Sequence, residues 1–292
     1  MRALVVGCGY AGMTVAAELV RQGHQVFGVR LSAKGAEELS AAGINPVIAD
    51  IAEPESLSTL SLPFDWVVNT TASTKGGSVE DYRRIYLSGT KNLLDILRAA
   101  PPKKFVYTSS TGVYAQDDGG QVSETSPAQP SAATAQVLLE TENLLLQAAQ
   151  TEHFPAVILR VSGIYGPERS HYLSQYLAGC AVIAGQGDRF VNMIHRDDLA
   201  AAIIAALKNG RGGEIYNVSD DEPVRQIHLY RWLSEALGRA MPRFVPETPE
   251  ARKRAASSKR VSNRKLKMEL GVQLKYPNFR AGLTAEIQRL DL

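Results

Sequence analysis

Three glycines near the start of the chain have the spacing of a phosphate-binding loop. Gly7, Gly9 and Gly12 follow an apolar run at residues 3–6 and precede a stretch of helical composition at residues 13–21. In this setting the first glycine permits a tight turn, the second lets the backbone approach a pyrophosphate, and the third lets a helix pack close to a strand. The first N–H groups of that helix would face the phosphates at the positive end of its dipole. The motif therefore predicts dinucleotide binding rather than an ordinary glycine-rich turn.

The composition is that of a globular protein of mixed charge. The 292 residues are 45% hydrophobic and 21% charged, and the net charge is +2. A charge this small gives no strong attraction to nucleic acid or to an anionic membrane. The two cysteines, Cys8 and Cys180, form neither a disulfide framework nor a metal cluster, which indicates a reducing compartment. We interpret Cys8 as a small spacer in the phosphate loop rather than a redox group.

The N-terminal segment does not have the pattern of a signal peptide. The first expected strand begins within a few residues of Met1, and the helix after it contains Glu18 and Arg21, which excludes a membrane span there. We expect a cytoplasmic protein whose partner is a small-molecule substrate, with no nucleic acid, membrane or metal bound.

Strand and helix patterns alternate over the first two thirds of the chain. Such alternation predicts an α/β protein with a doubly wound parallel sheet covered on both faces. Strands are expected at residues 3–6, 24–29, 45–50, 65–70, 104–109 and 156–161, and helices at residues 13–21, 34–42, 81–100 and 132–150. The pattern loosens near residue 162, so we expect a nucleotide-binding domain at 1–162 and a smaller, partly interleaved substrate lobe at 163–292.

In the second part, helices are expected at residues 171–181, 197–208 and 226–237, strands at 190–194 and 214–218, and a proline-rich linker at 241–249. A basic run follows at residues 252–267. Because no aromatic residues interleave with its charges, we favour a solvated face near an anionic substrate pocket over a nucleic-acid patch.

Several separated motifs occur in the order that one protein family has. They are residues 7–12, Asp50-Ile51, residues 68–72, 88–94, 107–114, 159–167, 194–200 and 215–218. Over nearly its whole length the chain thereby resembles the extended short-chain dehydrogenase/reductases, also called the NAD-dependent epimerase/dehydratase family. The resemblance implies a Rossmann-type fold, a nicotinamide cofactor and a small polar, sugar-like substrate.

The chain departs from this family at the residues that usually perform the chemistry. Relatives have a tyrosine and a lysine four residues apart on one helical face, the phenol acting as acid or base and the lysine lowering its pKa. Here Thr134 aligns with the tyrosine and Leu138 with the lysine, and no tyrosine of the chain has lysine four residues later. Tyr86 stands where the family commonly has asparagine. The pattern resembles atypical members that keep the cofactor fold.

Ser110 aligns with the substrate-binding serine of the family, and we expect its hydroxyl to bind a substrate oxygen. The alternative is a strand-end serine that satisfies the local backbone. If chemistry persists, the replacement acid is expected among Tyr86, Tyr114 and Tyr165, each of which could equally be a packing residue. We interpret His195 as structural, with Asp198 as a cap of the following helix.

The cofactor contacts follow from the loop and from the resemblance. In the loop we expect Gly7, Gly9, Tyr10, Ala11 and Gly12. Beyond it we expect Arg30, Ser32, Asp50, Ile51, Thr71 and Ala72. Arg30 stands where NAD-selective relatives have an acid, and an arginine can pair with a 2′-phosphate, so the sequence favours NADP over NAD.

Two functions remain open at this point. The favoured one is an NAD(P)-dependent oxidoreductase or epimerase/dehydratase-like enzyme with a non-standard active site. The alternative is a non-catalytic NADP-binding redox sensor or regulatory protein, which the missing Tyr-Lys pair would suit. A homodimer is expected to pair through the helices at residues 81–100 and 132–150.

Overall fold

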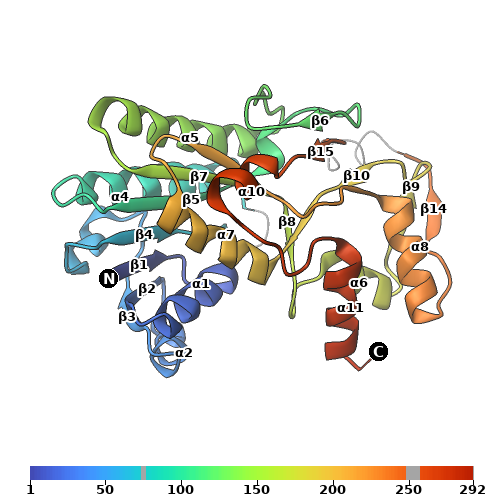
Figure 1. Cartoon of the computed structure of the whole chain (residues 1–292), viewed down its shortest axis with the longest axis horizontal. Helices are drawn as coiled ribbons and strands as arrows, with labels where there is room; N and C mark the ends of the chain where they lie inside the picture. The colour runs from blue at the N-terminus through green and yellow to red at the C-terminus, as the bar shows by residue number, and fades with distance from the viewer. Residues whose placement is uncertain (74–76, 248–256, 292) are drawn as a thin grey trace.

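A seven-stranded parallel sheet forms the larger of two lobes (Figure 1). The computed structural model describes residues 1–73, 77–247 and 257–291. The strands are β1 (Arg2–Val6), β2 (Gln25–Arg30), β3 (Asn45–Ile48), β4 (Trp66–Asn69), β5 (Lys104–Ser110), β7 (Ala156–Val161) and β12 (Ile215–Val218). Their order is β12-β7-β5-β4-β1-β2-β3, which confirms the expected doubly wound fold. The order reverses between β1 and β4, so a crevice opens there at the carboxyl ends of the strands.

Helices cover both faces of this sheet because side chains alternate along every strand. Ala3 and Val5 of β1 belong to one buried cluster, and Leu4 and Val6 belong to the other. The first cluster includes side chains of α1 (Tyr10–Arg21), α2 (Ala36–Ala41), α7 (Arg196–Asn209) and α10 (Arg264–Leu270). The second includes side chains of α4 (Gly89–Leu97) and α5 (Ala133–Glu152).

The helix expected at residues 81–100 is irregular. It consists of α3 (Val79–Tyr82), a π-helical segment η3 (Arg83–Ser88) and then α4. Ser78 and Asp81 form a capping box at its start. Single π turns inside α-helices occur frequently at functional sites, and this one contains Tyr86.

The smaller lobe gathers around a third buried cluster. Its helices are α6 (His171–Leu177), α8 (Gln226–Leu237) and α11 (Phe279–Arg289). Its strands form short pairs: β8 (Gly163–Tyr165) with β11 (Met193–His195), β9 (Val182–Ala184) with β14 (Arg243–Val245), and β10 (Phe190–Val191) with β13 (Val224–Arg225). A further pair, β6 (Gln121–Val122) with β15 (Arg260–Val261), and the short turns η1 (Ala33–Gly35), η2 (Pro54–Thr59) and η4 (Thr111–Val113) complete the elements.

The two lobes interleave along the chain. After residue 162 the chain enters the small lobe, returns for α7 and β12, leaves again, and returns once more for α10, which packs on α7 and β12 (Figure 1). A boundary at residue 162 therefore assigns a sheet strand and two covering helices to the second segment. The spatial lobes therefore do not coincide with continuous segments of the chain, because parallel strands need long crossover connections.

Some expected elements differ locally from those observed. The strand expected at 190–194 is two strands, and the linker expected at 241–249 contains β14 in its described part. Of the basic run, residues 252–256 lie outside the described residues. Arg260, Arg264 and Lys267 of the run are exposed, as expected of a solvated face. Lys259 is an exception, because it is only 4% exposed and its Nζ donates to the Tyr114 carbonyl oxygen at 3.0 Å and to Ser257.

Candidate functional site

The glycine loop after β1 has the shape of a phosphate cradle. Gly7 has a φ of +75°, and a Cβ there would lie 2.6 Å from the backbone of Thr71. A Cβ on Gly12 would lie 2.6 Å from the Gly7 carbonyl oxygen. At Gly9 the nearest atom to an added Cβ is 3.9 Å away, so the space on that side is open. The loop thus packs tightly at its first and third glycines and leaves room at the second, which fits a bound pyrophosphate.

The start of α1 supplies the donors of this cradle. Gly9 is the N-cap and provides no side-chain cap, and the first turn contains no acidic residue. The N–H groups of the first turn, including those of Tyr10 and Ala11, have no partner within the helix. Thr70 fixes the loop to the end of β4, since its hydroxyl contacts the carbonyl oxygens of Val6 and Gly7 at 3.1 and 3.0 Å.

Cys8 lies inside the loop but is fully buried. Burial raises the pKa of its thiol to about 11, so the reactive thiolate is scarce near neutral pH. A Cβ on Gly28 of β2 would lie 3.1 Å from the Cys8 sulfur. These contacts agree with a packing role for Cys8.

The residues expected around the adenosine end lie at the carboxyl ends of β2 and β3, with their side chains already engaged. Asp50 accepts from the Ala52 N–H at 2.9 Å and forms an ion pair with Arg84 at 2.9 Å. Ile51 is buried, and a Cβ on Gly89 would lie 2.7 Å from it. An adenine amino group at Asp50 would therefore share that carboxylate with an arginine.

Arg30 and Ser32 follow β2 as expected. The Arg30 guanidinium forms an ion pair with Glu38 of α2, with 2.9 Å between Nη2 and Oε2. Ser32 is exposed and provides no side-chain cap to η1. A 2′-phosphate at Arg30 would have to compete with the Glu38 carboxylate, which the sequence analysis did not foresee.

The end of β4 lies beside the glycine loop. The buried Asn69 accepts from the N–H and the hydroxyl of Thr71 at 3.1 and 2.7 Å, and its own amide donates to Thr90 at 3.1 Å. Ala72 is exposed. This network holds the strand end where a cofactor ribose is expected to pass.

Ser110 ends β5 at the same edge of the sheet. Its hydroxyl oxygen accepts from the Gly112 N–H at 3.0 Å, which is the local backbone contact that we weighed against a substrate role. The hydroxyl proton is still available to a ligand, because a serine oxygen can accept and donate at once.

The neighbouring Ser109 belongs to a buried ionic network instead. Its hydroxyl donates at 2.5 Å to Glu142, a fully buried carboxylate of α5 that is also paired with Arg160 at 2.6 Å. Glu142 lies four residues after Leu138 and eight after Thr134, on the same face of the helix. Sequence reasoning missed this pair, although a lone acid at that spacing on an apolar face was a usable signal.

Of the candidate tyrosines, Tyr86 and Tyr114 lie in the large lobe. Tyr114 is fully buried and donates its hydroxyl proton to Asn217 at 2.8 Å, which favours a packing role. The Tyr86 hydroxyl accepts from the Ser73 N–H at 3.0 Å. Burial raises the pKa of Tyr86, and the hydrogen bond from the Ser73 N–H and the charge of Arg169 partly offset that rise. The Tyr86 phenol is therefore protonated at neutral pH.

Tyr165 and His195 pack together between the lobes. Burial raises the pKa of Tyr165, and a Cβ on Gly282 of α11 would lie 1.9 Å from its hydroxyl oxygen. His195 caps α7, its Nδ1 accepting from the Asp197 N–H at 3.1 Å, which supports its structural interpretation. Asp198 is not the cap, because its carboxylate accepts instead from the N–H groups of Lys275 and Tyr276 at 2.7 and 2.9 Å.

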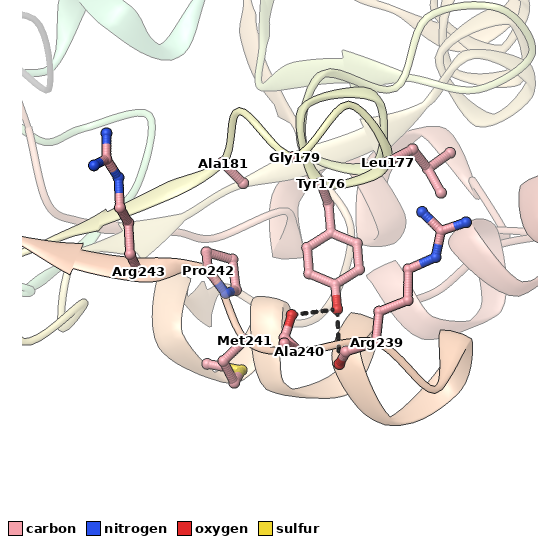
Figure 2. A pocket seen from close by; sticks show the side chains of 9 residues that line it. All are labelled: Tyr176, Leu177, Gly179, Ala181, Arg239, Ala240, Met241, Pro242 and Arg243. Carbon is pink, nitrogen blue, oxygen red and sulfur yellow. Dashed lines mark hydrogen bonds between the residues drawn. The ribbon is translucent and has the colours of Figure 1, made fainter.

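A cavity of about 620 Å³ opens in the smaller lobe beside Tyr165. Its polar lining residues are Glu168, Arg169, Ser170, His171, Tyr172, Ser174 and Asn192. A second cavity of about 390 Å³ lies between α6 and the segment before β14, where the Tyr176 hydroxyl donates to the carbonyl oxygens of Arg239 and Ala240 (Figure 2). The larger cavity has the size and polarity of a small-molecule site.

Within the described part of the chain, no three His, Cys, Asp or Glu side chains gather as metal ligands. A search of the described helices finds none that is long and apolar enough to cross a membrane.

The sheet order and the glycine cradle at its switch point define a dinucleotide-binding protein of the doubly wound class. A model of the NAD dependent epimerase/dehydratase family matches residues 3–219, and the chain belongs to this family. It is 30% identical over 281 residues to protein YeeZ of Escherichia coli K12, covering 94% of this chain and 96% of that one. It is 27% identical over 165 residues to human dTDP-D-glucose 4,6-dehydratase, covering 54% and 47% of the two chains.

Solved structures with this fold include a UDP-glucose 4-epimerase from Thermotoga maritima, with a TM-score of 0.85, 21% identity and coverage of 100% of this chain and 99% of that one. A dTDP-glucose 4,6-dehydratase from Bacillus anthracis in complex with NAD superposes with a TM-score of 0.84 at 20% identity, covering 100% and 96%. These likenesses confirm the fold. The family is NAD dependent, which confirms the expectation of a nicotinamide cofactor.

Proposed function

We infer that the protein is an NAD(P)-dependent oxidoreductase or epimerase/dehydratase-like enzyme that acts on a small polar substrate. The observation that carries this proposal is the glycine loop, which packs closely at Gly7 and Gly12 yet is open at Gly9. The cavity of about 620 Å³ in the smaller lobe supports it, since a sensor of cofactor alone needs no second pocket. Relatives that act on nucleotide sugars make a sugar-like substrate the first class to test.

The residues of the chain have distinct tasks in this proposal. The loop at Gly7 to Gly12 holds the cofactor phosphates, and the nicotinamide, when bound, exchanges a hydride with a substrate carbon. Ser110 donates its hydroxyl proton to the substrate oxygen, because its lone pair already accepts from Gly112. Tyr86 is the preferred proton donor, since Tyr114 is committed to Asn217 and the Tyr165 hydroxyl lies against α11.

The test follows absorbance of the reduced nicotinamide with a panel of ketones, aldehydes and nucleotide sugars. Ser110→Ala and Tyr86→Phe are expected to lower kcat at least tenfold on any substrate found, about 1.4 kcal/mol in the barrier. Tyr176→Phe is the matched control, because its hydroxyl contacts only main-chain oxygens around the second cavity (Figure 2). Unchanged kcat in the two site variants would refute their roles.

We also propose that NADP is preferred over NAD, with Arg30 pairing with the 2′-phosphate. Glu38 opposes this preference through its ion pair with Arg30. Arg30→Ala should therefore weaken NADPH binding selectively, and Glu38→Gln should strengthen it, both measured by titration against NADH. Tighter binding of NADH than of NADPH by the unaltered protein would refute the role of Arg30.

The second candidate function is a non-catalytic sensor of the cofactor. The replacement of the usual pair by Thr134 and Leu138 favours it. Tight cofactor binding without turnover of any member of the panel would support the sensor over the enzyme. In either case we expect a homodimer that pairs through the helices of residues 79–97 and 133–152, which light scattering can measure.

A further inference from the structure

A tight turn between β8 and α6 contacts both the cofactor loop and the larger cavity. Gly166 and Arg169 exchange both backbone hydrogen bonds, each at 3.1 Å. Pro167 and Glu168 occupy the centre of the turn, and Glu168 has a φ of +64°, the left-handed region that favours glycine. A non-glycine residue in this conformation costs about 1 kcal/mol or more and persists where its surroundings require it. The turn therefore fixes the position of Arg169 closely.

Arg169 lies between the proposed cofactor site and the cavity. Its guanidinium carbon is 5.4 Å from the centre of the Tyr10 ring, and Tyr10 belongs to the phosphate loop. The same turn contacts this loop through Gly166, where an added Cβ would lie 3.0 Å from the Tyr10 hydroxyl oxygen. Arg169 also lines the cavity of about 620 Å³, so one side chain contacts both places.

The charge of Arg169 has no carboxylate partner among the described residues, in contrast to its neighbours. Arg196, which stacks on the same Tyr10 ring at 5.1 Å, has Asp197 at 3.4 Å. Arg225 of the same lobe has Asp188 at 2.7 Å. Arg169 is exposed and lines the cavity, and an unpaired guanidinium in such a place is suited to bind a phosphate or a carboxylate in a forked geometry.

We propose that Arg169 is a specificity-determining residue that binds the anionic group of the substrate, a phosphate or a carboxylate, where the cavity meets the cofactor loop. This inference rests on the proposed function, because it places the substrate in that cavity. Glu168 also lines the cavity, and its carboxylate opposes an anion there. Adjacent residues thus have opposite predicted effects on the same ligand.

The experiment measures sugar binding by calorimetry to the protein loaded with whichever nicotinamide cofactor binds more tightly, with glucose 1-phosphate, glucuronate and glucose as probes. We expect one or both anionic sugars to bind more tightly than glucose, and the stronger of the two identifies the group. Arg169→Gln should weaken that binding about tenfold, whereas Glu168→Gln should strengthen it about threefold. Arg225→Gln is the matched control for loss of a paired charge in the same lobe and should leave binding unchanged.

Several results would overturn the proposal, and each is separable from failure of the proposed function. While the cofactor still binds, three results would overturn it: Arg169→Gln binds the anionic sugar as tightly as the unaltered protein does, glucose binds as tightly as the anionic sugars, or no probe binds. A parallel loss of cofactor affinity in Arg169→Gln would assign the residue to the cofactor instead. Failure of the unaltered protein to bind either nicotinamide cofactor would refute the proposed function itself.

Discussion

The second glycine of the phosphate loop allows cofactor binding to be separated from folding. A Cβ added at Gly9 has no atom closer than the Gly7 carbonyl oxygen, 3.9 Å away. Gly9→Ala should therefore still fold, with a loss in the free energy of unfolding of about 1 kcal/mol.

The same methyl group would fill the space in which a pyrophosphate approaches the start of α1. Each charge-assisted hydrogen bond to a phosphate oxygen contributes about 1.5–3 kcal/mol. Loss of one such bond, or weakening of two, corresponds to about 3 kcal/mol of binding free energy, which raises the dissociation constant roughly a hundredfold. The effect is large on binding and small on stability because the two processes use different sides of this residue.

The assay is calorimetric titration of the nicotinamide cofactors, with urea unfolding of each variant in parallel. Gly12→Ala is the matched comparison, since its Cβ would lie 2.6 Å from the Gly7 oxygen and 2.7 Å from the Thr70 hydroxyl. It should lose stability as well as binding, by about 1–3 kcal/mol for overpacking. Binding by Gly9→Ala within threefold of the unaltered protein would refute the cradle.

Two further predictions concern buried charges. Arg160→Met leaves the Glu142 carboxylate buried with Ser109 as its remaining side-chain partner. The variant should lower the free energy of unfolding, measured in urea, by about 3–5 kcal/mol. A double variant with Met at both Arg160 and Glu142 should recover most of that loss. Equal losses in the single and double variants would contradict this account. Burial lowers the pKa of Lys259 to about 8, so between pH 8 and its ordinary value of 10.5 the unfolded chain binds more protons and stability rises with pH. The difference in unfolding free energy between the unaltered protein and Lys259→Met should grow by about 3 kcal/mol over that window, and a pH-independent difference would exclude an effect of Lys259 titration.

Much of the large lobe could be predicted from local pattern. The strand at Ala156–Val161 has the expected bounds, and in the smaller lobe so does the helix at Gln226–Leu237. Apolar runs and helical periodicity report burial directly, and glycine spacing reports the turn that a phosphate needs. The π-helical segment at Arg83–Ser88 has no such signal in the sequence.

Side-chain partners were the least predictable part of the site. Asp50 and Arg30 were expected to face the cofactor, yet each already has an ion-pair partner, Arg84 and Glu38. Asp198 was expected to cap a helix and instead binds the backbone before α11. In each case the type of interaction was foreseeable from the residue, and the partner was not, since it depends on where other segments lie.

The amino-acid order by itself determined the class of fold, the spacing of the glycine loop and the absence of any tyrosine with lysine four residues later, because each depends on neighbours in sequence. Tertiary structure alone decided that Lys259 is buried, that Glu142 of α5 forms a buried ion pair with Arg160 of β7, and that Arg169 contacts both the loop and the cavity. These facts join segments far apart in the chain, and only packing in three dimensions sets which charges meet and which stay unpaired.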